Sequence, residues 1–450
     1  MKSDKFILNR LLELSIPTVA AFFLQSIYDI VDMFWVGKIS YQSITALTLF
    51  STILWVFAFL NEVVGSSSVS MISQSIGRKD YDYHSKVCEQ TITFKFIMGI
   101  ITMVFFLIFL RPLLNFYTDD KEVIELGITY GRLRIFFIPI MFSSFSVNTI
   151  FRCTGDSKTP MKIMVIAAII NIILDPLLMF DRMPYTNLPG LNLGIFGASL
   201  ATVISTSISF LIGFFLLIRP NDIFHLKIRN LFRLIPSIDK KLITIGIPSG
   251  LEMLLRFLFE AVMLKFVAMY GVVAITAAGI CSKLYGLAFM PMNGLLMGGS
   301  VLIGFFLGND DIDSAEETSK ISGLINFLIM FAYTVLCFAL PKTLIGFFSK
   351  NVQVLEVGSF MLPVSIVFVS LLGYSLGRGV VFTGSGYNTP LLVSSIISQW
   401  IVQIPIMIVF TNVLHFNAQQ LFYSYIPSDL VFFILMMYYY RKGRWRYTRV

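Results

Sequence analysis

The chain has 450 residues, of which 56% are hydrophobic and only 13% are charged, and its formal net charge is +8. Its mean hydropathy is +0.80, whereas an average soluble domain has about 45–50% apolar and about 25% charged residues. This composition excludes a soluble enzyme, and we attribute the positive charge to membrane orientation rather than to nucleic-acid binding. The chain has no G-x-x-x-x-G-K-[ST] phosphate loop, and its four cysteines lack metal-ligand spacing.

Long apolar blocks recur along the whole chain, and most reach the roughly 20 residues that a helix needs to cross a bilayer. They are too long, and too poor in period-two alternation, for the strands of a membrane β-barrel. The sequence therefore predicts an all-α polytopic membrane protein with twelve transmembrane helices. The expected span cores are 13–36, 46–76, 92–110, 124–151, 160–180, 195–218, 241–269, 275–307, 321–340, 356–382, 390–411 and 418–440.

Basic residues concentrate at both termini, in the 77–86 and 152–162 connections, and in a polar stretch at the centre of the chain. The positive-inside rule therefore puts both termini in the cytoplasm. An even number of spans agrees with this orientation. The predicted domains are an N-terminal six-helix lobe (1–219), a cytoplasmic linker (220–240), and a C-terminal six-helix lobe with a basic cytoplasmic tail (241–450).

An internal repeat with an offset close to 230 residues relates the two lobes. Ser15-Ile16-Pro17 recurs as Gly246-Ile247-Pro248, and the loop at 76–82 recurs at 307–313. A repeat unit with an even number of spans enters and leaves the membrane on the same side. The lobes are therefore expected to be parallel repeats, related by a pseudo-two-fold axis normal to the membrane, with the substrate site near the midplane.

The first span contains several polar side chains on one helix face. Gln25, Asp29 and Asp32 follow helical spacing, and Tyr28 precedes Asp32 by four residues. An ionisable residue inside a span is a candidate functional site, because burial of its charge is unfavourable by at least about 2.5–3.5 kcal/mol. The alternative for Asp29 is a solvated carboxylate near the outer interface. Pro17 removes a helix hydrogen bond and makes a bend in this span possible.

The fifth span carries Asn171 and Asp175 on one face, one turn apart. A carboxylate and an amide inside hydrocarbon require water, a cation or a proton, and Asp175 together with Asp32 would form a shared proton or cation site. Further polar or pliable candidates are Tyr130, Asn148, Met164, Ser199, Thr202 and Ser205. For these single residues, packing between helices is the competing explanation.

The seventh span contains Glu252, Arg256 and Glu260 at intervals of four residues. This ladder is either a second coupling site or an internal ion-pair network, and the second explanation is favoured. In the second span Glu62 has no partner in the sequence, and its role is left open.

In this order, the motifs resemble those of the multidrug and toxic compound extrusion (MATE) family, in particular its DinF-like prokaryotic branch. The resemblance covers about residues 8–440. The residues that carry it are Ile16-Pro17, Gln25-x-x-Tyr28-x-x-x-Asp32-x-x-x-Val36-Gly37, Gly77-Arg78-Lys79, Arg152-x-Thr154-Gly155-Asp156-x-x-Thr159-Pro160, Asn171-Ile172-Ile173-Leu174-Asp175-Pro176 and Gly194-x-x-Gly197-Ala198-x-x-Ala201-Thr202.

The resemblance implies an antiporter that expels organic, often cationic and amphipathic compounds in exchange for H+ or Na+ by alternating access. It implies a hinge at Pro17. The coupling residues that it implies are Asp32, Asn171, Asp175 and Thr202. The drug contacts that it implies are Gln25, Tyr28, Tyr130, Asn148 and Met164. Two departures stand out, since the tenth span has no acid beyond Glu356 at its mouth, and position 29 is acidic.

The sequence thus predicts a multi-pass multidrug exporter of the cell's inner (plasma) membrane, acting as a monomer on drugs or metabolites. It requires no cofactor besides the coupling ion and binds no nucleic acid. The alternative within the same superfamily is a flippase of lipid-linked precursors, which would have a strongly cationic cavity. A membrane-embedded enzyme or receptor is disfavoured by the parallel repeat and by the lack of a metal cluster.

Overall fold

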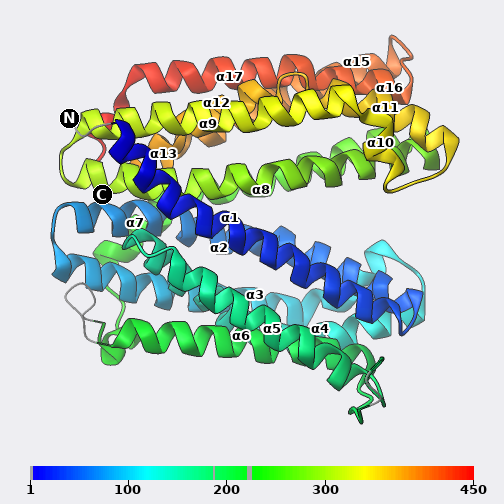
Figure 1. Ribbon diagram of the computed structural model, residues 1–450, viewed down its shortest axis with the longest axis horizontal. Coiled ribbons are helices and arrows are strands. Elements are labelled where there is room, and N and C mark those ends of the chain that lie inside the picture. The colour runs from blue at the N-terminus through cyan, green and yellow to red at the C-terminus, as the bar shows by residue number, and fades with distance from the viewer. Residues whose placement is uncertain (1–3, 186–187, 220–225) are drawn as a thin grey trace. The chain divides into compact units, whose positions relative to one another are not determined.

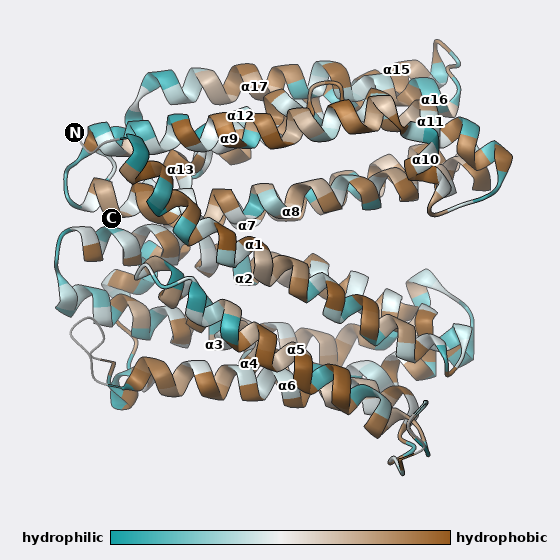
Figure 2. Ribbon diagram, viewed as in Figure 1, coloured by the Kyte–Doolittle hydropathy of each residue, from teal (hydrophilic) through white to brown (hydrophobic). Residues whose placement is uncertain are grey.

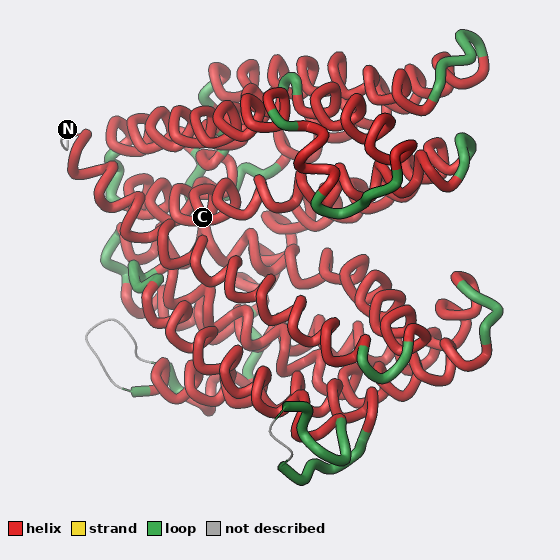
Figure 3. The backbone as a smooth tube through the Cα atoms, turned by 45° about the vertical axis from the view of Figure 1, so that its right-hand side comes forward, coloured by secondary structure: helices red, strands yellow, loops and turns green. Residues whose placement is uncertain are grey.

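The computed structural model describes residues 4–185, 188–219 and 226–450, and this part of the chain is almost entirely helical (Figure 1). Figure 3 shows helices joined by short connections and draws no strand in the described residues. An isolated bridge pairs Arg182 with Pro189. Twelve helical segments in the described part are long and apolar enough to cross a membrane, which confirms the predicted number.

Nine of the spans are continuous helices. They are α1 (Asp4–Gly37), α2 (Tyr41–Gly77), α3 (Tyr81–Tyr117), α4 (Lys121–Cys153), α5 (Lys158–Met179), α6 (Gly194–Ile218), α7 (Pro236–Ala268), α8 (Val272–Gly308) and α9 (Ile312–Ala339). The short helix α10 (Pro341–Gly346) follows α9. The last three spans are composite and consist of α11 (Val352–Ile366), α12 (Val369–Arg378) and α13 (Val380–Ser385); α14 (Thr389–Ser395), the π-helix η2 (Ile396–Gln403) and α15 (Ile404–Asn412); and α16 (Ala418–Leu421), the 3-10 turn η3 (Phe422–Ser424) and α17 (Tyr425–Lys442).

The helices extend beyond most of the predicted span cores, because hydropathy marks only their apolar middles. Figure 2 shows hydrophobic residues dominating the middles, with hydrophilic residues more frequent towards the connections. At the start of α3, for example, the Asp80 side chain caps the helix by accepting from the Tyr83 amide at 3.0 Å, so the helix begins eleven residues before the expected core. Similarly, α7 begins at Pro236, inside the expected linker.

The internal repeat is visible in the element boundaries. The starts of α2 and α8, of α3 and α9, of α4 and α11, and of α5 and α14 all lie 231 residues apart. The unusual backbone conformations repeat as well: φ is positive at Lys79 and Asp310, and again at Gly155 and Gly386. Each of the last two glycines supplies a left-handed turn between consecutive spans, a conformation that glycine adopts without steric strain.

The chain divides into two compact units, and each division falls inside a helix. Residues Ala20–Gly246 form one, here called the N-terminal unit; residues up to Val19 together with Ile247–Val450 form the other, the C-terminal unit. The first part of α1 therefore belongs to the C-terminal unit and the first part of α7 to the N-terminal unit. The two breaks lie beside Pro17 and Pro248, which are equivalent positions in the repeat.

Close helix crossings fix these two helix segments within their units. A Cβ atom on Gly246 of α7 would overlap the carbonyl oxygen of Val63 on α2, inside the N-terminal unit. A Cβ atom on Gly298 of α8 would likewise meet the hydroxyl of Ser15 on α1, inside the C-terminal unit. Small residues permit this close approach of helix backbones in membrane proteins.

The N-terminal unit also holds the connection that leads into α7. The 3-10 turn η1 (Ile228–Phe232) lies against α3. Glu89 Oε1 accepts from the Lys227 amide at 2.8 Å and from Asn230 Nδ2 at 3.2 Å. Gln90 donates to the Arg233 carbonyl at 2.8 Å. The α3 side chains thus fasten the connection to the N-terminal unit.

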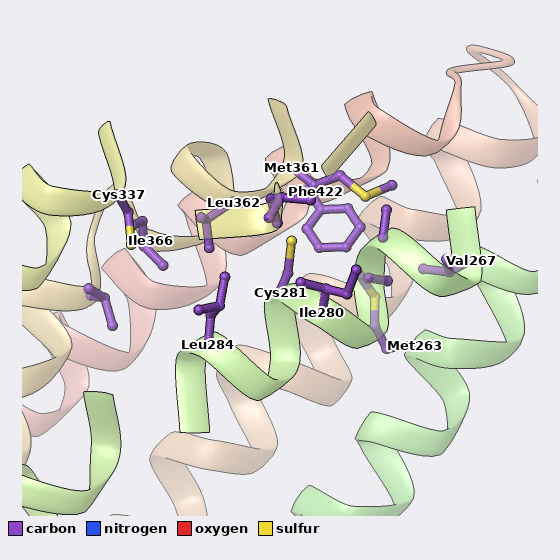
Figure 4. Close-up of a cluster of buried hydrophobic side chains, with 14 of the residues drawn as sticks. Met263, Val267, Ile280, Cys281, Leu284, Cys337, Met361, Leu362, Ile366 and Phe422 are labelled. Carbon is purple, nitrogen blue, oxygen red and sulfur yellow. The ribbon is translucent and has the colours of Figure 1, made fainter. Parts of the chain in front are cut away.

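Each unit has its own apolar core. In the N-terminal unit the core includes Phe50, Phe106 and Phe142, from α2, α3 and α4. Figure 4 shows the core of the C-terminal unit, in which Met263 and Met361 lie among aliphatic and aromatic side chains. Met263 occupies the position that corresponds to Asp32 in the repeat. The units therefore share helix positions but differ in polarity at this point.

Candidate functional site

Asp32 lies on α1 in the interior of the N-terminal unit, with 5% of its surface exposed. Its Oδ2 atom accepts a hydrogen bond from the Tyr130 hydroxyl of α4 at 3.4 Å. Its Oδ1 atom is buried and has no hydrogen-bond partner among the described residues. The structure therefore brings together Asp32 and Tyr130, which are 98 residues apart in the chain.

Asn171 and Asp175 lie on α5, and both are fully buried. The Asn171 amide donates to Asp175 Oδ1 at 3.2 Å, as their spacing of one helical turn predicts. Asp175 interacts electrostatically with Asp32. Asn171 Oδ1 and Asp175 Oδ2 are buried without a partner in the described part of the chain. Together with Asp32 Oδ1, they supply three buried oxygen acceptors to which no described residue donates.

Thr202 and Tyr28 complete this cluster. Thr202 lies on α6, and its hydroxyl donates to the Ala198 carbonyl at 3.0 Å. The Tyr28 side chain of α1 interacts with Thr202, Asp32 and Asp175. The four candidates for the coupling ion thus meet two of the five substrate candidates, Tyr28 and Tyr130, in one cluster. Helices α1, α4, α5 and α6 contribute its side chains.

Arg134, on α4, is a member of this cluster that the sequence analysis missed. Its Nη1 atom donates a short hydrogen bond to the Tyr130 hydroxyl, and its guanidinium carbon lies 5.2 Å from the centre of the Tyr130 ring and 5.9 Å from that of Phe50. Among the described residues, no carboxylate lies within 4.0 Å of its nitrogens, although it interacts electrostatically with Asp32. A basic residue four positions after Tyr130 inside an apolar span was the available signal.

Arg134 also lines a small cavity of about 30 Å³ between α4 and α6. Its polar lining consists of Arg134, Thr202, Thr206 and Ser207, and Ser207 Oγ is buried without a partner in the described chain. This volume exceeds the roughly 10–15 Å³ that one water molecule requires. The cavity can therefore hold water against the edge of the buried acidic cluster.

The remaining substrate candidates lie apart from this cluster or at its rim. Gln25 donates to Asp29 Oδ1 at 3.0 Å, and Asp29 is exposed. Asn148 lies on α4 about 27 Å along the helix from Tyr130, at 1.5 Å per residue. Met164 lies on α5 about 16 Å along the helix from Asp175. Both are half-buried, and they occupy a different depth from Asp32.

In the C-terminal unit, the ladder on α7 forms a weak ion pair. Arg256 Nε lies 3.8 Å from Glu252 Oε1, and the Arg256 side chain is 46% exposed. Ser395 donates to the same Glu252 oxygen at 3.4 Å. Glu260 interacts electrostatically with Arg256. This geometry agrees with an internal ion-pair network, the interpretation favoured from the sequence.

Two further polar clusters contain residues that the sequence left unassigned or overlooked. Asp429 on α17 interacts electrostatically with Tyr285 and Tyr425 in the C-terminal unit, and the sequence analysis did not identify it.

In the N-terminal unit, Glu62 of α2 approaches Lys95 of α3, and Lys95 is 1% exposed. Both charged groups converge over Gly65. Glu62 therefore has a partner that only tertiary packing could reveal.

These features define a multi-pass membrane transport protein. Twelve apolar spans arise from a six-span repeat, one unit carries a buried acidic cluster, and the described residues contain no group of three or more metal-ligating side chains that could hold a metal ion. Residues 17–177 and 248–409 each match the model of the MatE family. The chain belongs to this family, and the two matched segments correspond to the two copies of the repeat.

Known proteins resemble the chain over nearly its whole length. It is 25% identical to the probable multidrug resistance protein YoeA of Bacillus subtilis, covering 97% of this chain and 93% of the relative. It is also 25% identical to the multidrug export protein MepA of Staphylococcus haemolyticus, with the same coverage. A crystal structure of the Vibrio cholerae MATE transporter VcmN in the bent form superposes with a TM-score of 0.88 at 17% identity, covering 98% of this chain and 97% of that one.

Proposed function

We propose that the chain is a multidrug efflux antiporter. It exports organic, often cationic and amphipathic compounds in exchange for H+ or Na+ by alternating access. The observation that carries this proposal is the pair of buried carboxylates, Asp32 and Asp175, each with one oxygen that has no partner in the described chain. The names of YoeA and MepA support the substrate class.

The coupling cluster suits an exchangeable cation because its unsatisfied atoms are all acceptors. Asp32, Asn171 and Asp175 each present one oxygen that has no hydrogen-bond partner among the described residues. Two carboxylates at close range inside a protein disfavour simultaneous ionisation, and a proton or a monovalent cation relieves this repulsion. We propose that Asp32, Asn171, Asp175 and Thr202 form the coupling site. Binding of the coupling cation to this site from the outside would change how stably α1, α5 and α6 pack around it.

The first helix connects the coupling site to a movement of the units. Pro17 cannot donate a backbone hydrogen bond, and the break between the compact units falls two residues after it. Asp32 and Tyr28 lie beyond this point on the same helix. Loading of Asp32 would therefore alter how the outer part of α1 packs, with Pro17 as the hinge. The bent form described for VcmN supports bending in this fold.

The substrate would bind along α1, α4 and α5, the helices that also carry the carboxylates of the proposed coupling site and Tyr130. We propose that Gln25, Tyr28 and Tyr130 contact it beside the coupling site, and that Asn148 and Met164 contact it at the other depth of the N-terminal unit. The proposed orientation has both termini in the cytoplasm, and the proposed functional form is a monomer in the cell membrane. A lipid-linked precursor flippase would require a strongly cationic cavity, whereas this cluster contains two carboxylates and one guanidinium.

The test is efflux from proteoliposomes under an imposed pH or Na+ gradient, with each gradient varied separately. Asp32→Asn removes one coupling charge while keeping the size of the side chain, and we expect at least a tenfold loss of gradient-driven efflux. Glu13→Gln is the matched control, because Glu13 lies on the same helix, is exposed and pairs with Arg10 at 2.7 Å rather than with the cluster. Undiminished efflux by Asp32→Asn would contradict the proposal.

A further inference from the structure

We propose that the basic tail, residues 441–449, is a preformed binding surface for the headgroups of anionic phospholipids. Three of its cations, Arg441, Lys442 and Arg444, would contact the headgroups. The rest of the tail is docked on the C-terminal unit and holds these three cations in place. The inference concerns a lipid partner rather than transport, so it does not depend on the proposed antiport function.

One face of α17 changes from apolar to aromatic to basic just before the tail. Ile434 is 60% exposed and Tyr438 is 55% exposed. Lys442 continues the same spacing, is exposed, and lies about 12 Å along the helix from Ile434 at 1.5 Å per residue. Its Nζ atom lies 5.7 Å from the centre of the Tyr438 ring. Because tyrosine is enriched where a membrane span meets water, this order puts the tail at the level of the headgroups.

The chain turns back at the end of α17 instead of continuing away from the membrane. Gly443 adopts a left-handed conformation with φ at 69°, which glycine allows without strain, and its amide donates to the Tyr440 carbonyl at 3.1 Å. Trp445 is fully buried, and its Nε1 atom donates to the same carbonyl at 3.3 Å. The buried indole thereby fixes the path of the 3-10 turn η4 (Arg444–Tyr447).

Two cations of the tail pair with carboxylates at the α8–α9 connection and at the start of α9. Arg446 Nη2 lies 2.8 Å from Glu316 Oε2, and Arg449 Nη2 lies 3.0 Å from Asp310 Oδ1. In the first copy of the repeat, Lys79 occupies the position of Asp310. This carboxylate partner for the tail therefore occurs only in the second copy, the C-terminal unit.

The other three cations of the tail are accessible to a ligand. Arg441, Lys442 and Arg444 are exposed, and among the described residues no Asp or Glu oxygen lies within 4.0 Å of their nitrogens. Guanidinium and ammonium groups only donate hydrogen bonds, and phosphate oxygens are charged acceptors for them. The three side chains thus supply the charge and the donors that a phosphate headgroup requires.

Acidic side chains near the tail do not cancel this charge. Glu317 lies 3.2 Å from the Lys320 ammonium. Asp311 and Asp313 have no cation within 4.0 Å in the described part of the chain. On the other side of the balance, Arg378 adds a further cation, with its guanidinium carbon 4.0 Å from the centre of a tyrosine ring of α17. The cations without a carboxylate therefore outnumber the carboxylates without a cation, and the tail places three of them at the end of a membrane span.

The experiment measures lipid binding by the purified full-length protein through thermal unfolding in detergent. Phosphatidylglycerol, which is anionic, is titrated into the micelles, and phosphatidylcholine, which has no net charge, is titrated in parallel. The variant that removes the charges is Arg441→Gln/Lys442→Gln/Arg444→Gln. The variant that keeps them is Arg441→Lys/Lys442→Arg/Arg444→Lys.

The matched control removes three exposed cations at the other end of the C-terminal unit and so changes the net charge equally. It is Lys265→Gln/Lys342→Gln/Lys350→Gln. Soluble glycerol phosphate is a separate titration, because it carries the same phosphate chemistry without a membrane surface.

We expect phosphatidylglycerol to raise the apparent Tm of the wild type more than phosphatidylcholine does, and high ionic strength to reduce this difference by screening exposed charges. The variant without the three charges should need at least about tenfold more phosphatidylglycerol for a half-maximal shift, because each basic residue near an anionic surface adds to the attraction. The charge-keeping variant and the matched control should stay within about twofold of the wild type, and glycerol phosphate should cause no shift.

Equal shifts of the wild type with both lipids would overturn the inference. So would equal phosphatidylglycerol titrations of the wild type and the variant without the three charges. A loss in the matched control as large as in that variant would show an effect of net charge alone, and would count against a site in the tail. A shift with glycerol phosphate as large as that with phosphatidylglycerol would refute the assignment to a membrane surface.

Discussion

The crossing of α7 over α2 at Gly246 permits a stability prediction with a matched control in the same chain. In Gly246→Ala, the new Cβ atom would overlap the carbonyl oxygen of Val63. Because the obstructing atoms belong to the backbone, they cannot rotate away, and the two helices must separate. Overpacking of this kind costs about 1–3 kcal/mol, and the better helix propensity of alanine offsets about 1 kcal/mol at most.

The control is Gly279→Ala on α8, where nothing lies within 4 Å of the added Cβ atom. There only the propensity gain of about 0.8–1.0 kcal/mol remains, so the control should be slightly stabilised. In Gly246→Ala, because the obstructing Val63 atoms are all backbone atoms, the cost of overpacking lies in the upper part of its range, at about 2–3 kcal/mol. After the propensity offset, a net loss of about 1–2 kcal/mol remains. At about 2–4 °C per kcal/mol for a unit of this size, we expect the apparent Tm of Gly246→Ala to lie about 2–8 °C below that of the wild type.

The assay is thermal unfolding of the purified protein in detergent, followed by intrinsic tryptophan fluorescence at one scan rate, because unfolding of such proteins is commonly irreversible. An apparent Tm for Gly246→Ala at or above that of the wild type would refute the proposed close crossing. The same variant should also slow gradient-driven efflux, since Gly246 lies at the division between the two compact units.

Three further outcomes follow from the polar clusters. Asp429→Asn should leave gradient-driven efflux within about twofold of the wild type, because the proposed coupling site lies in the other unit; loss comparable to that of Asp32→Asn would place coupling in both units. Lys95→Met should lower stability by about 1–3 kcal/mol by removing the buried cation that faces the half-buried Glu62, and adding Glu62→Gln should restore part of this loss in thermal unfolding. Glu89→Ala removes two hydrogen bonds to the connection before α7, and limited trypsin digestion in that connection should accelerate; an unchanged rate would show that these bonds do not hold it.

The sequence predicted the number of spans and the repeat, because both depend on local properties of the chain. A helix across a bilayer must be apolar over its own length, so hydropathy located all twelve spans without knowledge of their packing. The repeat could be read from recurring residues at one offset, and the helix starts bear it out. Hydropathy could not locate the helix ends, because capping by residues such as Asp80 continues a helix beyond its apolar part.

The sequence also identified the buried carboxylates, since an acid inside an apolar span is conspicuous by itself. The one-turn spacing of Asn171 and Asp175 predicted their hydrogen bond. The sequence could not show that Tyr130 would donate to Asp32, or that Arg134 would donate to Tyr130. The first of these contacts joins residues on two helices that are far apart in the chain. The second lies within one helix, but it reaches Asp32 only because Tyr130 makes the first contact.

The sequence by itself thus determined which segments cross the membrane and which of them contain charge. Only the tertiary structure decided which charges meet, because this depends on which faces of the helices pack together. Packing placed Arg134 beside the Tyr130 that donates to Asp32, gave Glu62 its partner in Lys95, and assigned the first parts of α1 and α7 to opposite units. The physical reason is that hydropathy and helical period are properties of one segment. Contacts between segments depend instead on how the side chains of two helices fit together, which neither segment determines alone.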